Sequence, residues 1–208
     1  MELEIYQTGA LQVNTYLLKD EESKEAVLID VGGSFAKIKK QLDNDGYTLK
    51  YVLNTHGHFD HIMGEIEIQR NHPEIPIYIH KGDEPHYLHL QEEMNMWGFN
   101  CEVEPLKPTK TIDENEELFI GKNRIQIFYT PGHSEGSLSY YIDGKVFTGD
   151  TLFQRSIGRT DFFDGDYDTL IEAIKDKILT LPEETLVFPG HGPSTTVKEE
   201  KKYNTYLK

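Results

Sequence analysis

The chain has 208 residues, and its 21 basic and 36 acidic side chains give a formal net charge of −15. This charge argues against nucleic acid or an anionic membrane as a main partner, because both select basic surfaces. The length and the ordinary hydrophobic content suit one globular domain, which we expect to span residues 1–208.

Cysteine content and the N-terminal residues bear on where the protein acts. Cys101 is the only cysteine, so no internal disulfide can form. Glu2 and Glu4 stand among the first residues, and no apolar stretch of signal-peptide length follows them. No run approaches the apolar length of a membrane span. We therefore expect a cytoplasmic monomer or small homo-oligomer whose partner is a small-molecule substrate.

The first part of the chain predicts strands that alternate with helices. A glycine pair ends the third strand, and Ser34 is a plausible N-cap for the helix that follows. Gly46 ends that helix, and His72 before a proline stops the next one. Strands are expected at 3–7, 13–19, 25–31, 51–54 and 75–79, and helices at 34–45 and 60–71.

The rest of the chain divides into an irregular segment and a strand-rich half. Residues 81–108 show no clear period and predict a helical turn or two with a loop. From Lys110 onward the pattern predicts strands separated by turns such as Asp143-Gly144. The expected strands are 110–113, 117–120, 124–130, 138–142, 145–148 and 185–188, and the expected helices are 167–180 and 195–206.

One short segment, His56-x-His58-x-Asp60-His61, combines three histidines and an aspartate. It follows an apolar run and precedes a helix-like pattern, so it reads as a turn at the end of a strand. Imidazole and carboxylate are the usual ligands of zinc and related divalent ions. Gly57 allows two nearby histidines to turn toward one ion, which a straight strand with alternating faces would forbid. The segment therefore predicts a metal-binding turn.

A similar pattern recurs at three later positions. The runs IFYTPGH, KVFTGD and LVFPGHG each end in a short glycine-containing turn beside a potential ligand. Strand ends present side chains to a cleft, and glycine lets the backbone come close to a ligand. These turns add His133, Asp150 and His191 to the candidates. Seven ligands are too many for one ion and suit two ions that share a carboxylate.

A paired-metal centre predicts hydrolysis. A bound metal lowers the pKa of water from about 15.7 to about 7, so a metal-bound hydroxide is available at neutral pH. The same ions polarise a carbonyl and stabilise the oxyanion that forms after attack. Such a site needs neither a serine nor a cysteine nucleophile.

These motifs, in this order, resemble the ligand motifs of the metallo-β-lactamase superfamily. The stretches GRTDF (158–162) and LPEETLVFPGHGPSTT (181–196) are most similar to the glyoxalase II-like hydrolases within it. The resemblance implies an α+β fold, the αββα sandwich, in which two mixed sheets pack face to face with helices on the outer faces. It places the metals at one edge of that sandwich.

The resemblance also implies a division of the ligands between two divalent ions, zinc by preference and iron or manganese as alternatives. Asp60 would in addition orient the attacking hydroxide. Asp30, in LIDVGG, matches a position that supports the ligands from behind, although a strand-end cap is an equal interpretation. The implied ligands are His56, His58 and His133 for metal 1, Asp60, His61 and His191 for metal 2, and Asp150 as the bridge.

The implied reaction is attack of a metal-bound hydroxide on an activated acyl carbonyl, with a thioester such as S-lactoylglutathione favoured. Lactone and phosphoester hydrolysis are alternatives on the same metals. A further alternative, a mononuclear iron persulfide dioxygenase, would use His56, His133 and Asp150. Glyoxalase II binds glutathione partly through an additional C-terminal helical region, and the short segment after His191 argues against glutathione in particular.

Other side chains have two interpretations each. Arg159 is a candidate for holding a substrate carboxylate, and a salt bridge to Asp161 or Asp164 is the alternative. His86 and His89 are a candidate third metal site, although we expect a solvated or loop-facing pair. Four more apolar residues predict either a wall of the substrate pocket or loop packing: Met94, Met96, Trp97 and Phe99.

Overall fold

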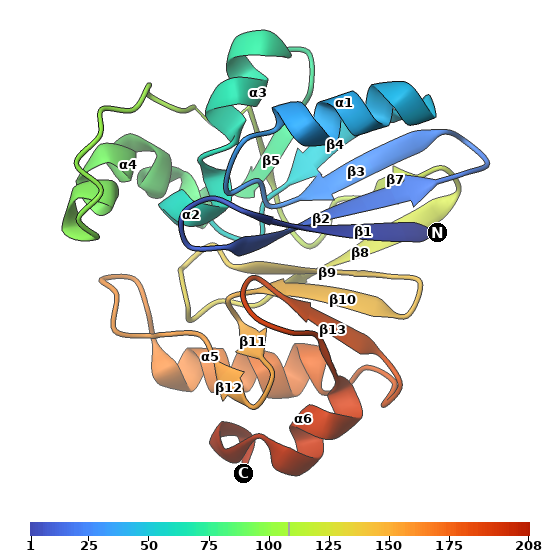
Figure 1. Ribbon diagram of the computed structural model, residues 1–208. Coiled ribbons are helices and arrows are strands. Elements are labelled where there is room, and N and C mark those ends of the chain that lie inside the picture. The colour runs from blue at the N-terminus through green and yellow to red at the C-terminus, as the bar shows by residue number, and fades with distance from the viewer. Residues whose placement is uncertain (108) are drawn as a thin grey trace.

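Two six-stranded sheets pack face to face, and helices cover both outer faces (Figure 1). The structure, a computed structural model, describes residues 1–107 and 109–208. The αββα sandwich predicted from the sequence is confirmed. Among the helices of the described residues, none is both long and apolar enough to cross a membrane.

The first sheet has the order β1-β2-β3-β4-β5-β6. Its first three strands pair antiparallel, and β3 to β6 pair parallel, so the sheet is mixed. Parallel pairs need crossover connections, and helices supply them. The strands are β1 Glu2–Thr8, β2 Val13–Asp20, β3 Glu25–Ile29, β4 Thr48–Leu53, β5 Ile77–His80 and β6 Lys110–Ile112, and the helices between them are α1 Ala36–Asp45, α2 Phe59–Ile62, α3 Glu65–Asn71 and α4 Glu84–Met96.

The second sheet has the order β14-β13-β10-β9-β8-β7, with one parallel pair, β10 and β13. The connection between that pair carries a two-stranded hairpin and a helix that continues into a π-helical turn, Ile174–Ile178. The strands are β7 Leu118–Ile120, β8 Asn123–Tyr129, β9 Leu138–Ile142, β10 Lys145–Gly149, β11 Leu152–Phe153, β12 Ser156–Ile157, β13 Leu186–Pro189 and β14 Thr195–Thr196, and the helices are α5 Tyr167–Ala173 and α6 Val197–Tyr203.

The core lies in three layers, one between the sheets and one under each set of helices. β8 is buried on one face only, so its apolar residues alternate: Ile125 and Ile127 are buried, and Gln126 is exposed. β2 is buried at every position, because the second sheet covers one face and α1 the other.

The start of α1 differs from the prediction. α1 begins at Ala36 without a side-chain cap, so the prediction of Ser34 as its N-cap is wrong. The Ser34 hydroxyl instead donates to Glu67, which also accepts the backbone N–H of Phe35 at 2.8 Å. Gly46 ends α1 with φ 73°, as predicted.

The helix predicted over 60–71 is in fact two helices, α2 and α3, which meet at Gly64. The Gly64 N–H donates to the carbonyl of Val31 at 2.7 Å. A Cβ at Gly64 would lie 2.1 Å from the carbonyl oxygen of Gly33. The break is therefore imposed by close packing on the segment after β3, which an apolar period along the chain does not reveal.

The prediction of an irregular segment at 81–108 is wrong for its first half. α4 occupies Glu84–Met96, with Pro85 in its first turn, where proline is tolerated. Its buried face includes His86 and Tyr87 beside Leu90, and these polar or amphipathic residues hide the helical period. Pro108, the last residue of the predicted segment, lies outside the described residues.

The C-terminal helix predicted over 195–206 is shorter than expected. Thr195 and Thr196 form β14, and α6 begins only at Val197. The Thr196 hydroxyl caps α6 by accepting the N–H of Glu199 at 3.1 Å. The hairpin of β11 and β12 was not predicted, because two-residue strands carry too little pattern to detect.

Candidate metal centre

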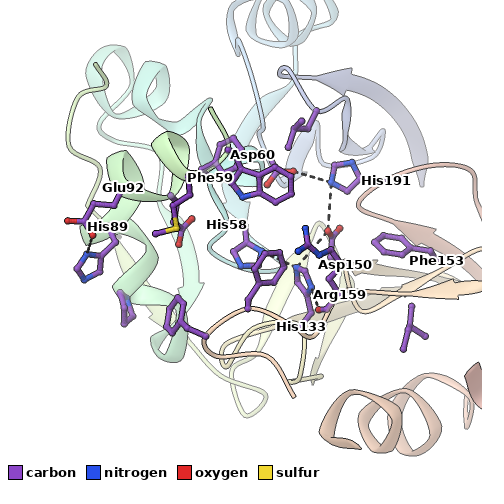
Figure 2. Close-up of a pocket in the computed structure, with 18 of the residues that line it drawn as sticks. His58, Phe59, Asp60, His89, Glu92, His133, Asp150, Phe153, Arg159 and His191 are labelled. Carbon is purple, nitrogen blue, oxygen red and sulfur yellow. Dashed lines mark hydrogen bonds and ion pairs between the residues drawn. The ribbon is translucent and has the colours of Figure 1, made fainter. Parts of the chain in front are cut away.

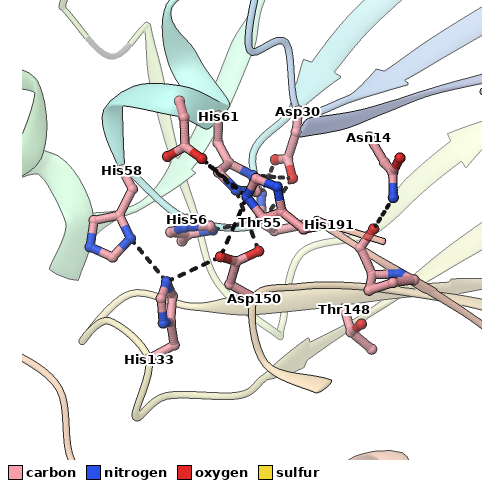
Figure 3. Close-up of polar contacts among 12 residues, drawn as sticks. Asn14, Asp30, Thr55, His56, His58, His61, His133, Thr148, Asp150 and His191 are labelled. Atoms are coloured by element: carbon pink, nitrogen blue, oxygen red, sulfur yellow. Dashed lines mark hydrogen bonds and ion pairs between the residues drawn. The ribbon is translucent and has the colours of Figure 1, made fainter. Parts of the chain in front are cut away.

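All seven predicted ligands lie together at one edge of the sandwich, where the two sheets meet (Figure 3). They come from turns that follow β4, β8, β10 and β13, and from the short helix α2. Two groups have ligand atoms within 4.8 Å of one another and match the sets implied for the two ions. These groups are His56, His58 and His133, and Asp60, His61 and His191.

Asp150 lies between the two groups. Its Oδ2 atom is 3.7 Å from Nε2 of His133 in one group and 3.7 Å from Nε2 of His191 in the other. Its Oδ1 atom is 3.4 Å from Nε2 of His61. One carboxylate therefore faces both groups, which is the geometry that a bridging ligand needs.

The donor set fits divalent cations. Nε2 of His56, Nε2 of His61 and Oδ1 of Asp150 are buried and have no hydrogen-bond partner among residues 1–107 and 109–208. A buried polar atom without a partner is costly, so native structures seldom leave one unexplained. Three such atoms at one place are accounted for by cations that accept their lone pairs. Ligation by the seven residues stays a prediction that this geometry supports.

The charges of the site also suit cations. Burial holds the pKa of His56 and that of His58 well below the usual range, and neighbouring imidazoles add to this effect, so both rings are neutral. Burial opposes ionisation of Asp150, but His61 and the other histidines hold its pKa below the usual range. Ligands must be deprotonated before they bind a metal. His56, His58 and Asp150 are already deprotonated at neutral pH.

His61 has the opposite shift. Burial alone would lower its pKa, but the nearby carboxylates of Asp60, Asp30 and Asp150 raise the pKa well above the usual range. Its ring therefore lies where negative potential is strong. Such a place attracts a positive charge, either a proton or a metal ion.

Asp30 contacts the ligands from behind. Its Oδ2 atom is 2.8 Å from Nδ1 of His61 and accepts the hydroxyl of Thr55 at 2.8 Å, and its Oδ1 atom accepts the Thr55 N–H at 2.7 Å. Because Nδ1 of His61 donates to Asp30, Nε2 is left to face the site. Asp30 holds this position with a left-handed backbone, φ 54°, a strain typical of functional sites.

Two other histidines are oriented in the same way. The Thr55 hydroxyl donates to Asp30, so it accepts Nδ1–H of His56 at 3.0 Å. The carbonyl of Arg159 accepts Nδ1–H of His133 at 2.8 Å. In the His56 ring Nε2 has no partner among the described residues, and in the His133 ring Nε2 lies 2.9 Å from Nδ1 of His58, an atom of another candidate ligand.

Sequence reasoning missed Asp83, which holds two of the ligand turns together. This buried carboxylate accepts the Gly57 N–H at 2.8 Å, the Ser134 hydroxyl at 2.8 Å and the Gly136 N–H at 2.5 Å. It therefore joins the turn after β4 to the turn after β8. A single aspartate in KGDEP gives no sequence signal of these distant partners.

Of the expected solvated or loop-facing pair, His86 faces a loop and His89 faces solvent. The His86 ring is buried, with Nε2 3.0 Å from Oδ2 of Asp164 and Nδ1 bonded to Glu93. These carboxylates outweigh burial and raise the pKa of His86 to about 10. Both ring nitrogens thus carry protons, so the group reads as an ion pair rather than a third metal site. His89 is exposed and pairs with Glu92.

A cavity of about 890 Å³ opens in front of the ligands (Figure 2). Met96 and Trp97 line the cavity, as the interpretation of a pocket wall predicts. Met94 and Phe99 belong to an apolar cluster with Phe59, as the interpretation of loop packing predicts. Arg159 also lines the cavity and makes the expected salt bridge, with Nε and Nη2 each 2.9 Å from an oxygen of Asp161.

The comparisons with known proteins agree with this site. The family model of the metallo-beta-lactamase superfamily matches residues 8–191. The probable metallo-hydrolase YqgX of Bacillus subtilis is 40% identical, over 96% of this chain and 94% of that protein. The hydroxyacylglutathione hydrolase GloC of Haemophilus influenzae is 34% identical, over 100% and 98%. The crystal structure of TTHA1623 in a di-iron-bound form is 34% identical, with a TM-score of 0.87 over 98% and 100%. The chain belongs to the metallo-beta-lactamase superfamily.

Proposed function

We propose that this metallo-hydrolase binds two divalent ions and cleaves acyl thioesters. The observation that carries the proposal is the position of Asp150 between two three-residue groups of ligands. Bound ions would lower the pKa of a coordinated water and polarise the substrate carbonyl. The similarity to GloC, a hydroxyacylglutathione hydrolase, supports a thioester as the substrate.

In this proposal Asp60 acts both as a ligand and as the residue that orients the attacking water. Its carboxylate lines the cavity, and its Oδ2 atom lies 3.1 Å from Nε2 of His191. The other oxygen of this carboxylate is then available to accept a proton from water. Phe59 and Phe162 line the same cavity and keep bulk water away from the scissile bond.

The lining of the cavity favours an acyl substrate over a phosphoester. Beside the candidate ligands the cavity is lined by Phe59, Trp97 and Phe162, and Arg159, the one lysine or arginine among the described residues that line it, is paired with Asp161. The walls therefore offer contacts to an apolar acyl group and no free lysine or arginine for a phosphate.

The test is release of thiol from S-lactoylglutathione and from a simple acyl thioester by zinc-loaded protein. We expect turnover in the wild type and a loss of at least about 100-fold in His58→Ala, because a ligand is removed. Zinc content measured on the same samples should approach two ions per chain in the wild type. Equal rates in the two proteins would contradict the proposal.

An iron-dependent reaction is the second candidate, and the di-iron-bound form of TTHA1623 is the observation that favours it. A persulfide dioxygenase would need one iron, held by His56, His133 and Asp150. Oxygen consumption with glutathione persulfide by iron-loaded protein, without thioester cleavage, would support this candidate. Thioester cleavage by the iron-loaded protein without oxygen uptake in the presence of glutathione persulfide would exclude it.

A further inference from the structure

We infer that the cavity selects thioesters with an uncharged hydrophobic acyl group and discriminates against polyanionic thiols such as coenzyme A. The inference rests on the proposed thioesterase function and adds the substrate class to it. Three features carry it: the apolar walls of the cavity, its charges, and the contacts that hold the walls apart.

Two apolar walls line the cavity in front of the candidate ligands. One wall is the end of α4, where Met96 is 82% and Trp97 46% exposed. The other is the loop after β12, where Phe162 packs against the ligands and Phe163 is 82% exposed. Large apolar side chains gathered at the rim of a cavity mark a binding surface.

The apolar surface reaches the ligands themselves. The ring of Phe162 lies 4.8 Å from that of His58 and 5.6 Å from that of His133, measured between centroids. On the opposite side, Phe59 lies 6.1 Å from Trp97. A group attached directly to the scissile carbonyl would therefore contact aromatic rings. Carrier thiols are polar, so the apolar walls fit the acyl arm.

The charges of the cavity oppose anions. Beyond the ligands, the acidic lining residues are Glu92 and Glu93, and the protein carries a net charge of −15. Arg159 is the one lining lysine or arginine among the described residues, and Asp161 accepts from both its Nε and its Nη2. At the rim, away from the site proposed for the ions, the phosphates of coenzyme A would thus meet a negative protein without an unpaired lysine or arginine among the described lining residues.

Two contacts hold the walls at a fixed separation. The guanidinium of Arg159 lies 4.6 Å from the ring of Phe162 and 5.5 Å from that of Trp97, so it joins the walls at the rim. Deeper in the protein, His86 on α4 pairs with Asp164 of the loop. The cavity is therefore preformed, and its volume of about 890 Å³ accommodates an acyl chain together with a small thiol.

The kinetic test compares octanoyl and acetyl thioesters of N-acetylcysteamine, a neutral thiol, with octanoyl-coenzyme A. For zinc-loaded wild type we expect kcat/KM to be at least about tenfold higher for octanoyl than for acetyl, because several methylenes are buried. We also expect octanoyl-coenzyme A to be the poorer octanoyl substrate. Equal rates for the two acyl groups, or a preference for coenzyme A, would overturn the inference.

Matched variants on α4 test whether the apolar wall causes the preference for the octanoyl group. Met96→Ala removes an exposed apolar side chain that lines the cavity, and Leu88→Ala removes one that is 79% exposed on the same helix and does not line it. We expect Met96→Ala to reduce the octanoyl preference about threefold or more and Leu88→Ala to leave it unchanged. Equal effects of the two variants would contradict a role for the wall.

A binding measurement separates this inference from the proposed function. Trp97 is the only tryptophan, so its fluorescence reports directly on the cavity. The probe is S-octyl-N-acetylcysteamine, a thioether that cannot be hydrolysed. We expect a saturable change in fluorescence that is weaker in Met96→Ala and unchanged in Leu88→Ala. Binding without any thioester turnover would refute the thioesterase alone, and absence of binding would refute the inference.

Discussion

At the scale of single residues, the site depends on side chains that fix which ring nitrogen faces the ions. Each of three histidines donates its Nδ1 proton to one acceptor. The acceptors are Asp30 for His61, the Thr55 hydroxyl for His56 and the Arg159 carbonyl for His133. Every such contact leaves Nε2 directed at the site. The arrangement of the candidate ligands is therefore built by residues outside the set proposed to hold the ions.

We expect Asp30→Asn to weaken metal binding about 10-fold to 100-fold, because an amide nitrogen cannot accept the Nδ1 proton of His61. Asparagine tolerates a left-handed backbone, so strain does not complicate the result. The measurement is competition with a chelator of known zinc affinity. Asp143→Asn is the matched control, since Asp143 has φ 51° in an exposed turn. Equal affinities in the two variants would refute this role.

Asp83 allows a second prediction. Asp83→Ala leaves two backbone N–H groups and the Ser134 hydroxyl buried without an acceptor, at about 1–3 kcal/mol each. We expect urea denaturation to show a loss of at least about 3 kcal/mol in the free energy of unfolding. Asp113→Ala, which removes an exposed turn carboxylate bonded to Asn115, should cost about 1 kcal/mol or less. Similar losses in the free energy of unfolding for Asp83→Ala and Asp113→Ala would contradict the stabilising role of Asp83.

At the scale of elements, α4 is the part that the sequence did not reveal and on which the cavity depends. Its inward face carries His86, whose ring joins Glu93 of the same helix to Asp164 of the loop after β12. Strands such as β8 were predicted to within a residue or two, because their alternation depends on one buried face. α4 has no such regular pattern, since a charged pair takes part of its buried face.

His86→Ala would leave the carboxylates of Glu93 and Asp164 without their buried partner. Removing one member of a buried pair costs about 3–5 kcal/mol, and we expect that loss to loosen α4 against the loop. Hydrogen exchange of the α4 amides should become faster, and KM should rise more than kcat falls. Leu88→Ala, on the same helix but exposed and outside the lining of the cavity, is the control. Unchanged exchange in His86→Ala would exclude this role.

The ligands were predictable where α4 was not, and the difference is physical. A metal ion restricts residue type and spacing along the chain, so HxHxDH and the three later turns stand out locally. Asp83 and His86 act through partners that are distant in the sequence and chemically ordinary. No pattern within one segment records such contacts.

At the scale of the whole molecule, stability should depend on pH through Glu65. This side chain at the start of α3 is buried against Asn54 and Tyr87, and burial raises its pKa to about 8 despite the hydrogen bonds they donate. The folded protein therefore holds a proton that the unfolded chain, with a pKa near 4.5, releases. The stability that this proton contributes to the free energy of unfolding is fully present below the unfolded pKa near 4.5. It is lost as the pH rises through the folded pKa of about 8.

Glu65→Gln removes the titrating group while keeping the shape of the side chain. We expect the free energy of unfolding of the variant to fall less steeply than that of the wild type as the pH rises from about 5 to about 8. Urea denaturation at several pH values in that range gives both slopes. Parallel slopes would show that Glu65 does not hold its proton in the folded state.

The division of the ligands between the two sheets has a consequence during protein synthesis. Translation completes His56, His58, Asp60 and His61 long before the turns that carry His133, Asp150 and His191. The growing chain thus presents a strong chelating segment before the second sheet exists to complete it. We expect an ion captured at that stage to be enclosed when the sheets close. We therefore expect metal content after purification to reflect the ions present during synthesis, and protein refolded in a defined metal to report the preference of the site itself.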